Sequence, residues 1–227
     1  MNLFDILGPV MVGPSSSHTA GAGRIGRIAR RLLGEGTPVR AVIGLGGSFA
    51  ATGHGHGTDR AIVAGLLGMQ TDDERIAVSF DEAKKAGMDF AFTRINLSSG
   101  DHPNTARLEL TGKSGRVMTL TASSHGGGGI MVAQMDGLRA SFSGDLPTLI
   151  VQNRDKPGHV SLVASMLAQN NVNIATLQVY RDYPGGSAVM IIETDKAVPQ
   201  AGIDYLSHME GIISVRFIDA EGESHGH

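Results

Sequence analysis

The first segment that could do chemistry places hydroxyl side chains and a histidine directly ahead of a helix-like run. Its residues are Ser15, Ser16, Ser17, His18 and Thr19. A hydroxyl before a helix accepts a hydrogen bond from an unpaired backbone N–H, so one of them is expected to cap the helix. They supply more hydroxyls than one cap needs, and a helix N-terminus also attracts small anions such as carboxylates. Two interpretations stay open, a well-capped helix after the Gly13-Pro14 turn and a carboxylate site.

The second segment, residues 53–59, is rich in glycine and contains His54, His56 and Asp59. Imidazole nitrogens and a carboxylate this close together occur in zinc and iron sites. No further ligand cluster accompanies them, so we assign no metal to this chain. The closing His225-Gly226-His227 indicates a solvated tail.

The motif G-x-G-x-x-G occurs at residues 21–26. It indicates a dinucleotide site only when it follows a strand, precedes a helix and has an acidic residue ~20 positions further on. Here it follows the polar Ser/His/Thr run, and residues 41–47 contain no Asp or Glu. We therefore reject a dinucleotide site and expect these glycines to allow close helix packing. The nearby arginines 24, 27, 30 and 31 indicate either a solvated helix face or a surface for an acidic partner.

Three motifs together resemble those of a known enzyme family. They are residues 13–19, residues 53–59 and the segment Asp-His-Pro-Asn-Thr-Ala-Arg at 101–107, in the family's order. On these motifs the chain resembles the β chain of the bacterial iron–sulfur L-serine dehydratase, and the likeness runs to about residue 219. One departure is visible, because the family usually has Lys where this chain has His54. His56 stays in register.

The resemblance implies a reaction shared between two chains. In this family the β chain pairs with an α chain that carries a [4Fe–4S] cluster, and L-serine is converted to pyruvate and ammonia. Dehydration removes the Cα proton, and the resemblance implies His56 as the base, since histidine can act near neutral pH.

A positioned base contributes about 10²–10⁴-fold, too little alone for a weakly acidic Cα–H and a poor leaving group. A Lewis acid would supply much of the rest. This chain has no cysteine and cannot hold a cysteine-ligated cluster, so the iron must come from the α chain.

The resemblance also implies which side chains hold the substrate. They are Ser15, Ser16, Ser17, His18, Thr19, Asn104 and Arg107. A guanidinium suits this role because it can bind a carboxylate with two parallel hydrogen bonds, although Arg107 could equally be a surface residue of a strand. Residues 124–129 offer backbone N–H groups for a small ligand. We favour the alternative that they form the entrance of a hairpin.

The composition is that of a soluble globular protein and fits a cytoplasmic location. With 227 residues, 41% hydrophobic and 18% charged, the chain can form one large or two small domains. A net charge of −3 indicates no general nucleic-acid or anionic-membrane partner. No apolar run approaches the ~18 residues of a membrane span. We expect no signal peptide, and the lack of cysteine fits a protein without disulfides.

Residues 1–144 are predicted to form a mixed α/β domain, similar to an amino-acid-binding regulatory domain of some phosphoglycerate dehydrogenases. Helices are expected at 17–33, 60–68 and 81–86, and strands at 39–45, 90–95, 105–110, 117–122, 130–135 and 138–142. Gly34 should end the first helix, and Thr58 or Asp59 should cap the second. Hairpin turns are expected at residues 112–115 and at Asp136-Gly137.

Beyond a boundary near residues 143–147 the pattern becomes strand–helix–strand–strand–helix–strand, which is the ferredoxin-like βαββαβ order. With an Asp-x-Pro-Gly turn at 155–158, residues 147–219 resemble an ACT domain, a regulatory module that often binds amino acids between paired copies. The resemblance implies self-association and effector binding by Asn153, Asp155, Pro157 and Gly158. A purely architectural dimerising role is the alternative. Residues 220–227 are expected to be a disordered tail.

The residues and the resemblance lead to an α+β protein that serves as the β subunit of an iron–sulfur L-serine dehydratase. The rival hypothesis is a non-catalytic amino-acid-sensing subunit, whose partner would do all the chemistry. A stand-alone metal hydrolase built on His54 and His56 is a third.

Overall fold

The computed structural model describes residues 15–53, 55 and 57–220. The predictions for Gly13, Pro14, His54, His56 and the tail after residue 220 therefore lie outside the described residues. The chain divides into two compact units between Asp136 and Gly137. The domain limits 1–144 and 147–219 stay a prediction. Among the described helices, none is both long and apolar enough to cross a membrane.

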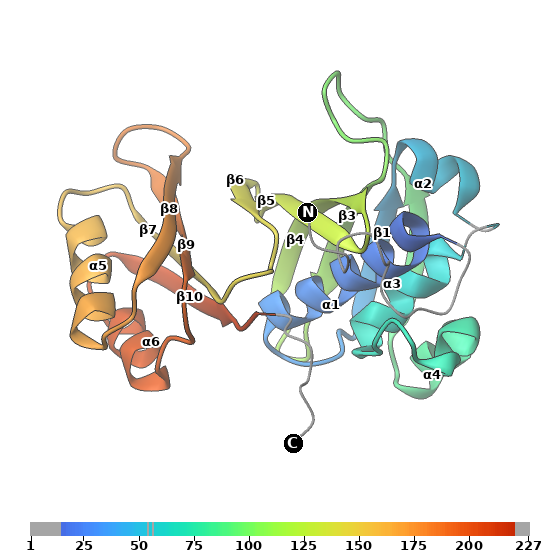
Figure 1. The fold of residues 1–227 in the computed structure, drawn as a ribbon, viewed down its shortest axis with the longest axis horizontal. Coiled ribbons are helices and arrows are strands. Elements are labelled where there is room, and N and C mark those ends of the chain that lie inside the picture. Colours follow the sequence, from blue (N-terminus) through green and yellow to red (C-terminus); the bar gives the residue numbers. More distant parts are fainter. Residues whose placement is uncertain (1–14, 54, 56, 221–227) are drawn as a thin grey trace, which may run out of the picture. The chain divides into compact units, whose positions relative to one another are not determined.

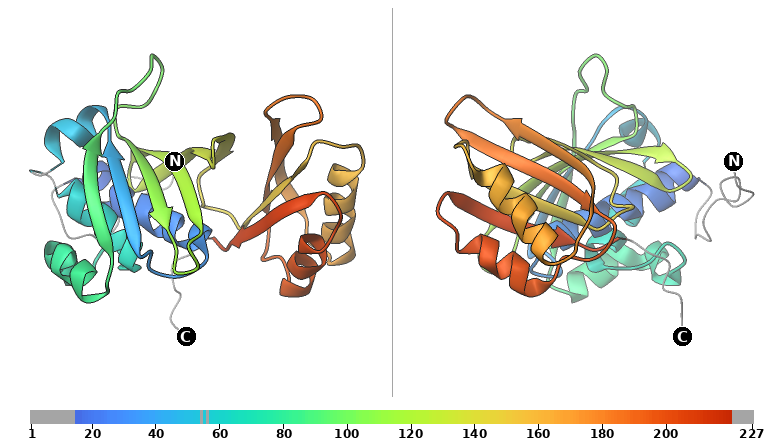
Figure 2. Two further views of the ribbon diagram at one scale, coloured as in Figure 1. Left: turned by 180° about the vertical axis from the view of Figure 1, so that it is seen from behind. Right: turned by 60° about the vertical axis from the view of Figure 1, so that its left-hand side comes forward.

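The first unit is a mixed sheet with its main helices on one face (Figures 1 and 2). Its strands are β1 (Arg40–Leu45), β2 (Asp89–Arg94), β3 (Thr105–Thr111), β4 (Val117–Gly126) and β5 (Gly129–Met135). They lie in the order β2-β1-β3-β4-β5, with β1 and β2 parallel and the other pairs antiparallel. The predicted mixed α/β fold is confirmed.

The helical segments of this unit include two that are not α-helical. They are the π-helix η2 (Ser16–Gly21), α1 (Ala22–Leu33), α2 (Gly47–Thr52), α3 (Thr58–Leu67), the 3₁₀-helix η3 (Glu74–Val78) and α4 (Ser79–Lys85). The apolar stripe expected on the first helix is confirmed, since Ile25, Ile28 and Leu32 are buried on α1. The helix ends at Gly34, whose φ of 78° suits glycine.

Helices α1 and α3 pack so closely that side chains would not fit between them. A Cβ on Gly65 would overlap the carbonyl oxygen of Gly23, and one on Gly26 would overlap that of Ile62. The G-x-G-x-x-G segment thus lies in η2 and α1, where Gly26 and the carbonyl of Gly23 serve helix contact as expected. Gly21 instead lies against Ser124 of β4. The nearest approach is set by backbone atoms, which makes this crossing intolerant of larger residues.

Two predictions about the helix ends and polar faces are wrong. Helix α3 is preceded by Gly57 in a left-handed conformation with φ 70° and has no side-chain cap, because Thr58 and Asp59 already lie in its first turn. Arg27 is not on a solvated face. It is 8% exposed, and its guanidinium donates to the Met69 carbonyl just beyond the C-terminus of α3. A cation there satisfies carbonyls left unpaired by the helix end.

The second unit has the predicted ferredoxin-like βαββαβ order. Its elements after β6 (Leu138–Phe142) are β7 (Thr148–Arg154), α5 (His159–Gln169), β8 (Ile174–Arg181), β9 (Ser187–Thr194), α6 (Gln200–Ser207) and β10 (Ile212–Ile218). The sheet order is β10-β7-β9-β8, all antiparallel. The turn before β6 has positive φ at Asp136 and Gly137, 50° and 79°, as a two-residue hairpin turn requires.

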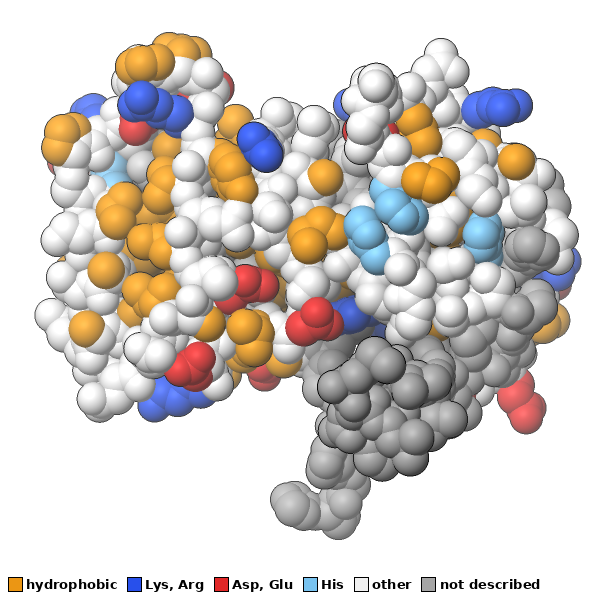
Figure 3. Space-filling view, turned by 45° about the horizontal axis from the view of Figure 1, so that its top comes forward, with side chains coloured by type: hydrophobic (Ala, Val, Ile, Leu, Met, Phe, Trp, Pro, Cys, Tyr) orange, Lys and Arg blue, Asp and Glu red, His pale blue; other side chains and the backbone are white. Residues whose placement is uncertain are grey.

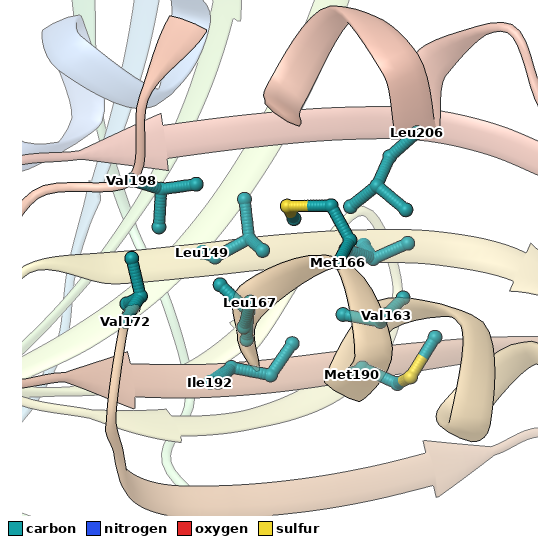
Figure 4. Close-up of a cluster of buried hydrophobic side chains, with 10 residues drawn as sticks. Leu149, Val163, Met166, Leu167, Val172, Met190, Ile192, Val198 and Leu206 are labelled. Atoms are coloured by element: carbon teal, nitrogen blue, oxygen red, sulfur yellow. The ribbon is translucent and has the colours of Figure 1, made fainter. Parts of the chain in front are cut away.

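The core of the second unit is a layer of aliphatic side chains between the sheet and its two helices (Figure 4). Leu149 from β7 and Ile192 from β9 meet Leu167 from α5 and Leu206 from α6, and all four are fully buried. Alternation along β7 and β9 sends Leu149, Val151, Met190 and Ile192 into this layer, and this alternation could be recognised in the sequence.

Candidate functional site

The Ser/His/Thr segment forms the entry to helix α1, and it does so as a wide turn. Ser15 is extended with φ −143°, and its hydroxyl accepts from the His18 backbone N–H at 3.3 Å. The Thr19 N–H donates to the Ser15 carbonyl at 2.9 Å. The expected hydroxyl cap is thus present at Ser15. A π-type turn is rare and often marks a functional site, because it displaces side chains from the regular helix face.

The imidazole of His18 contacts hydroxyls on both of its nitrogens. Nδ1 lies 3.3 Å from Ser15 Oγ and 3.2 Å from Ser17 Oγ. Nε2 lies 3.1 Å from Ser48 Oγ, on the short helix α2. The ring also packs edge-on against Phe49, with centroids 5.5 Å apart. His18 is therefore held from both sides and oriented with respect to the serines.

Ser48 was not singled out from the sequence, yet it joins the first motif to the third. Its backbone N–H donates to the Pro103 carbonyl at 2.8 Å, in the Asp-His-Pro-Asn segment. Gly47 before it has a φ of 48°, and a Cβ there would lie 2.5 Å from the same carbonyl oxygen. Only glycine fits this approach without strain. The first and third motifs, which lie far apart in the sequence, thus meet around α2.

Asn104 is positioned by strand β4 on two sides. Its backbone carbonyl accepts from the Ser124 N–H at 3.0 Å, and its side-chain amide donates to the Ser124 carbonyl at 3.4 Å. Ser124 is fully buried, and a Cβ on Gly21 of η2 would overlap its hydroxyl. The strand therefore fixes both Asn104 and the wide turn. Residues 124–126 lie in β4, so the favoured hairpin interpretation of 124–129 is confirmed.

A histidine pair lies beside Asn104 and was missed as a pair in the sequence. The rings of His102 and His125 are 4.4 Å apart, and His125 Nε2 lies 2.9 Å from Ser123 Oγ. His102 Nδ1 accepts from the Asn104 backbone N–H at 3.1 Å. Burial, and secondarily His125, lower the pKa of His102. Histidine side chains reach the surface of this unit in Figure 3. Only the fold brings these residues together, because they lie on different elements.

Arg107 is more exposed to solvent than the residues of the hydroxyl cluster. It is exposed on β3, while its neighbours Ala106 and Leu108 are buried on the helix-covered face. Side chains alternate along a strand, so Arg107 points to the opposite face of the sheet. This placement matches the surface alternative, and a substrate role for Arg107 stays a prediction.

A cavity of about 180 Å³ opens beside the second motif. It is lined partly by Phe49 of α2, by Arg94 at the end of β2 and by Asp59. Asp59 is 4% exposed, and its carboxylate accepts from the Arg60 N–H at 2.7 Å. The cavity thus reaches the first turn of α3, directly after His56 in the chain. His56 itself, predicted as the base, lies outside the described residues.

In the second unit the predicted effector residues surround the β7–α5 turn. Asp155 accepts from the Gly185 N–H at 3.0 Å and pairs with Arg181 at 3.2 Å, and these contacts lower its pKa. Asn153 donates to His159 Nδ1 at 3.2 Å, and its buried Oδ1 has no hydrogen-bond partner among the described residues. Pro157 precedes Gly158, whose φ of 99° begins α5. Effector binding there is untested and stays a prediction.

The residues of this chain do not fit an iron–sulfur cluster. The sequence has no cysteine, and thiolates are the usual ligands of such clusters. Within the described residues, His, Asp and Glu side chains form no group of three that could hold a metal ion. Any cluster would have to be bound by another chain.

Comparison with known proteins defines the class first. The family model described as "Serine dehydratase beta chain" matches residues 2–88. The "Probable L-serine dehydratase, beta chain" of Bacillus subtilis is 43% identical, over 94% of this chain and 96% of that protein. The "L-serine dehydratase, beta chain" of Peptoniphilus asaccharolyticus is 34% identical, over 95% and 97%. The chain therefore belongs to the family of L-serine dehydratase β chains, as its motifs indicated.

Two further similarities concern proteins of other names. The D-3-phosphoglycerate dehydrogenase of Bacillus subtilis is 28% identical over 87% of this chain, but only 37% of that protein is covered. The crystal structure of the ACT domain from the GTP pyrophosphokinase of Chlorobium tepidum covers 33% of this chain and 99% of that one, at 15% identity and a TM-score of 0.25. The ferredoxin-like assignment of the second unit rests on its own strand order.

Proposed function

We propose that this chain is the β subunit of a two-chain L-serine dehydratase, a carbon–nitrogen lyase also called L-serine ammonia-lyase. The reaction converts L-serine to pyruvate and ammonia. The observation that carries the proposal is the meeting of the first and third motifs around His18 and Ser48, in a chain that belongs to this family. A cluster of hydroxyl, amide and imidazole groups suits a small zwitterion better than it suits an apolar ligand.

The serines of η2 and His18 would hold the amino acid, together with Thr19 and Asn104. The backbone at the N-terminal end of this long helical segment favours a carboxylate, and the serine hydroxyls of the wide turn can contact the other polar groups of the amino acid. Asn104 donates through Nδ2 to Ser124, which leaves its side-chain carbonyl to accept from an ammonium group. Arg107 would reach the carboxylate only from the other sheet face, so it is the weakest member of the proposed set.

His56 would take the Cα proton of bound serine. Its neutral imidazole accepts a proton near pH 7, and the β-hydroxyl leaves as water once protonated. The enamine product then becomes an imine, which water hydrolyses to pyruvate and ammonia. The buried Asp59 lies three residues further on, at the cavity in the first turn of α3. This chain would thus supply the substrate cradle and the base.

An α chain would supply the [4Fe–4S] cluster. The absence of cysteine leaves this chain without the usual cluster ligands, and the relatives are themselves described as β chains. The proposed active site therefore lies between two polypeptides.

Co-expression with a cluster-bearing α chain tests the proposal. An anaerobic pyruvate assay should show L-serine turnover by the pair and none by either chain alone. Full-rate turnover by the purified β chain, free of iron, would contradict it. Turnover by the β chain alone would also contradict an active site shared between two chains.

The second unit would bind an amino-acid effector and associate with a second copy. Strand β8 is an edge of its sheet, and Leu177 and Val179 on it are 40% and 48% exposed. An exposed edge with apolar side chains favours pairing with another chain. Calorimetry of the full chain with L-serine should show binding that Asn153→Ala weakens. Ser17→Ala, a change in the first unit, is the control and should leave binding at the second unit unaffected. Heat that is unchanged by Asn153→Ala would exclude this effector site.

The alternative function is a non-catalytic amino-acid sensor. The similarity to a D-3-phosphoglycerate dehydrogenase, of which only 37% is covered, favours it, because the same kind of segment there accompanies a different activity. In that case both units would bind amino acids and the partner would carry the chemistry.

A further inference from the structure

Ser48 contacts His18 on the nitrogen opposite to the serine cluster, and this arrangement has a chemical consequence. A neutral imidazole carries one N–H, so one nitrogen donates and the other accepts. Which nitrogen carries the proton is set by the hydrogen bond that the other makes. Here Nε2 faces Ser48 Oγ at 3.1 Å, and Nδ1 faces Ser17 Oγ at 3.2 Å and Ser15 Oγ at 3.3 Å.

The contacts favour a proton on Nε2. Ser15 Oγ already accepts from the His18 backbone N–H, so its own hydrogen is free to point toward Nδ1. Ser17 Oγ lies 3.2 Å from Nδ1 and 3.4 Å from Ser15 Oγ, so one of the two hydroxyls donates to the single lone pair of Nδ1 and the other donates to its neighbouring hydroxyl. Nδ1 then accepts, and the remaining N–H on Nε2 donates to Ser48. A donor at Nε2 needs an oxygen there, and Ser48 provides it.

The proton position decides what the serine hydroxyls offer to a ligand. When the Ser15 and Ser17 hydroxyls donate toward His18, one directly and one through its neighbour, each oxygen keeps a lone pair that can accept from an ammonium group. With the proton on Nδ1 the hydroxyls would accept from the ring, and their hydrogens would face outward instead. That arrangement would suit a second anionic group and would repel an ammonium.

We propose that Ser48 is a positioning residue that keeps the Nε2–H form of His18 and thereby makes the Ser15 and Ser17 hydroxyls recognise the ammonium group of the substrate. The proposal rests on the proposed function and specifies which part of the amino acid the cluster reads. Ser48 is itself held in place by its N–H bond to Pro103 and by Gly47, so the position of its hydroxyl is set by the backbone.

The first test measures the proton directly, in the full chain without any assay of turnover. The ¹⁵N shifts of the His18 ring, assigned with a His18→Gln variant, should report the Nε2–H form in the natural protein. Ser48→Ala should move them toward a mixture of the two forms, and Ser48→Thr, which keeps the hydroxyl, should not. Unchanged shifts in Ser48→Ala would overturn the proposal. If Ser48→Ala fails to fold, Ser48→Cys replaces it, because a thiol is only a weak hydrogen-bonding group.

The second test uses the pair with its α chain and separates recognition from folding. Ser48→Ala should raise the KM for L-serine about tenfold, since hydrogen bonds to charged groups are among the stronger ones, with kcat much less affected. The inhibition constant of 3-hydroxypropanoate, which is serine without its ammonium, should stay unchanged. An equal rise in the KM for L-serine and in the inhibition constant of 3-hydroxypropanoate would indicate a merely structural role for Ser48 and would overturn the proposal. Lack of turnover by the natural pair would contradict the proposed function, whereas the ring shifts would still decide the role of Ser48.

Discussion

The two units differ in how closely their helices approach neighbouring elements. In the second unit α5 and α6 contact the sheet through fully buried aliphatic side chains such as Leu167 and Leu206 (Figure 4). In the first unit α1 and α3 approach until a Cβ on Gly26 or Gly65 would overlap backbone atoms. Side-chain layers tolerate exchange of similar volume, whereas backbone contact tolerates almost none. The unit with the tighter construction is the one that carries the hydroxyl and histidine cluster.

The largest expected effect tests whether the first unit carries chemistry at all. His56→Ala in the reconstituted pair should lower turnover by about 10²–10⁴-fold, the usual contribution of a positioned base. His54→Ala is the matched control, because the family usually has Lys at that position, and it should retain most of the activity. The measurement is anaerobic pyruvate formation beside L-serine binding. Retained turnover of His56→Ala with altered cooperativity would favour the sensor alternative.

A substitution that creates a cavity in the core of the second unit should lower its free energy of unfolding more than a single substitution at its surface. Leu167→Ala removes a fully buried side chain and should destabilise the unit by about 2–5 kcal/mol. Val160→Ala on the same helix is the control, because Val160 is 43% exposed. All three tyrosines lie after residue 137 and the chain has no tryptophan, so tyrosine fluorescence in urea reports this unit alone. Equal midpoints for the two variants would contradict the described core.

Adding a single methyl group at the contact between α1 and α3 should lower the stability of the first unit. Gly65→Ala would force α1 and α3 apart and should cost about 1–3 kcal/mol, as overpacking does. Gly23→Ala is the control on the same crossing, because its Cβ would lie 3.4 Å from the Ala61 carbonyl oxygen, an ordinary contact. Far-UV circular dichroism should register the loss for Gly65→Ala while the tyrosine transition stays in place. A shift of the tyrosine transition alone would refute the assignment of these glycines.

Most of the second unit could be predicted from the sequence, and the reason lies in its regular alternation. Strands β7 and β9 send alternate residues, Leu149 with Val151 and Met190 with Ile192, to one core, which is a local signal. In the first unit the stripe of α1 and the hairpin of β3 and β4 were legible for the same reason. Helix α2 was not, because a six-residue helix that begins with Gly47 has neither periodicity nor a side-chain cap.

The candidate site was predictable as motifs but not as contacts. Ser15 and His18 stood out as residue types, and the hydroxyl cap followed from the chemistry of helix ends. The contact between Ser48 and His18 and the ring contact between His102 and His125 both depend on partners distant in sequence. Propensity and periodicity describe neighbours along a chain, so they cannot reveal such pairs. Arg107 was the converse case, since its type suggested binding and its strand position exposes it.

The smallest expected effect concerns the pH dependence of the free energy of unfolding. The pKa of His102 is lowered in the folded protein by burial and by the nearby His125, so the unfolded chain binds this proton more readily. Stability should therefore be complete above the ordinary histidine pKa of about 6.5 and decline as the pH falls through that value. Urea unfolding followed by circular dichroism at about pH 7.5 and about pH 5.5 measures the decline. His102→Gln should flatten this slope, and an unaltered slope would show that the pair does not titrate with folding.

The contact between Gly21 and the Ser124 hydroxyl bears on how new substrates could be accommodated. Any side-chain carbon at position 21 would overlap that oxygen, and position 47 is equally closed by the Pro103 carbonyl. The buried side of the proposed ligand site therefore has no room for larger residues, whereas the half-buried serines 15 to 17 do not share this limit. Libraries that seek altered amino-acid selectivity should randomise those outward positions and leave both glycines intact.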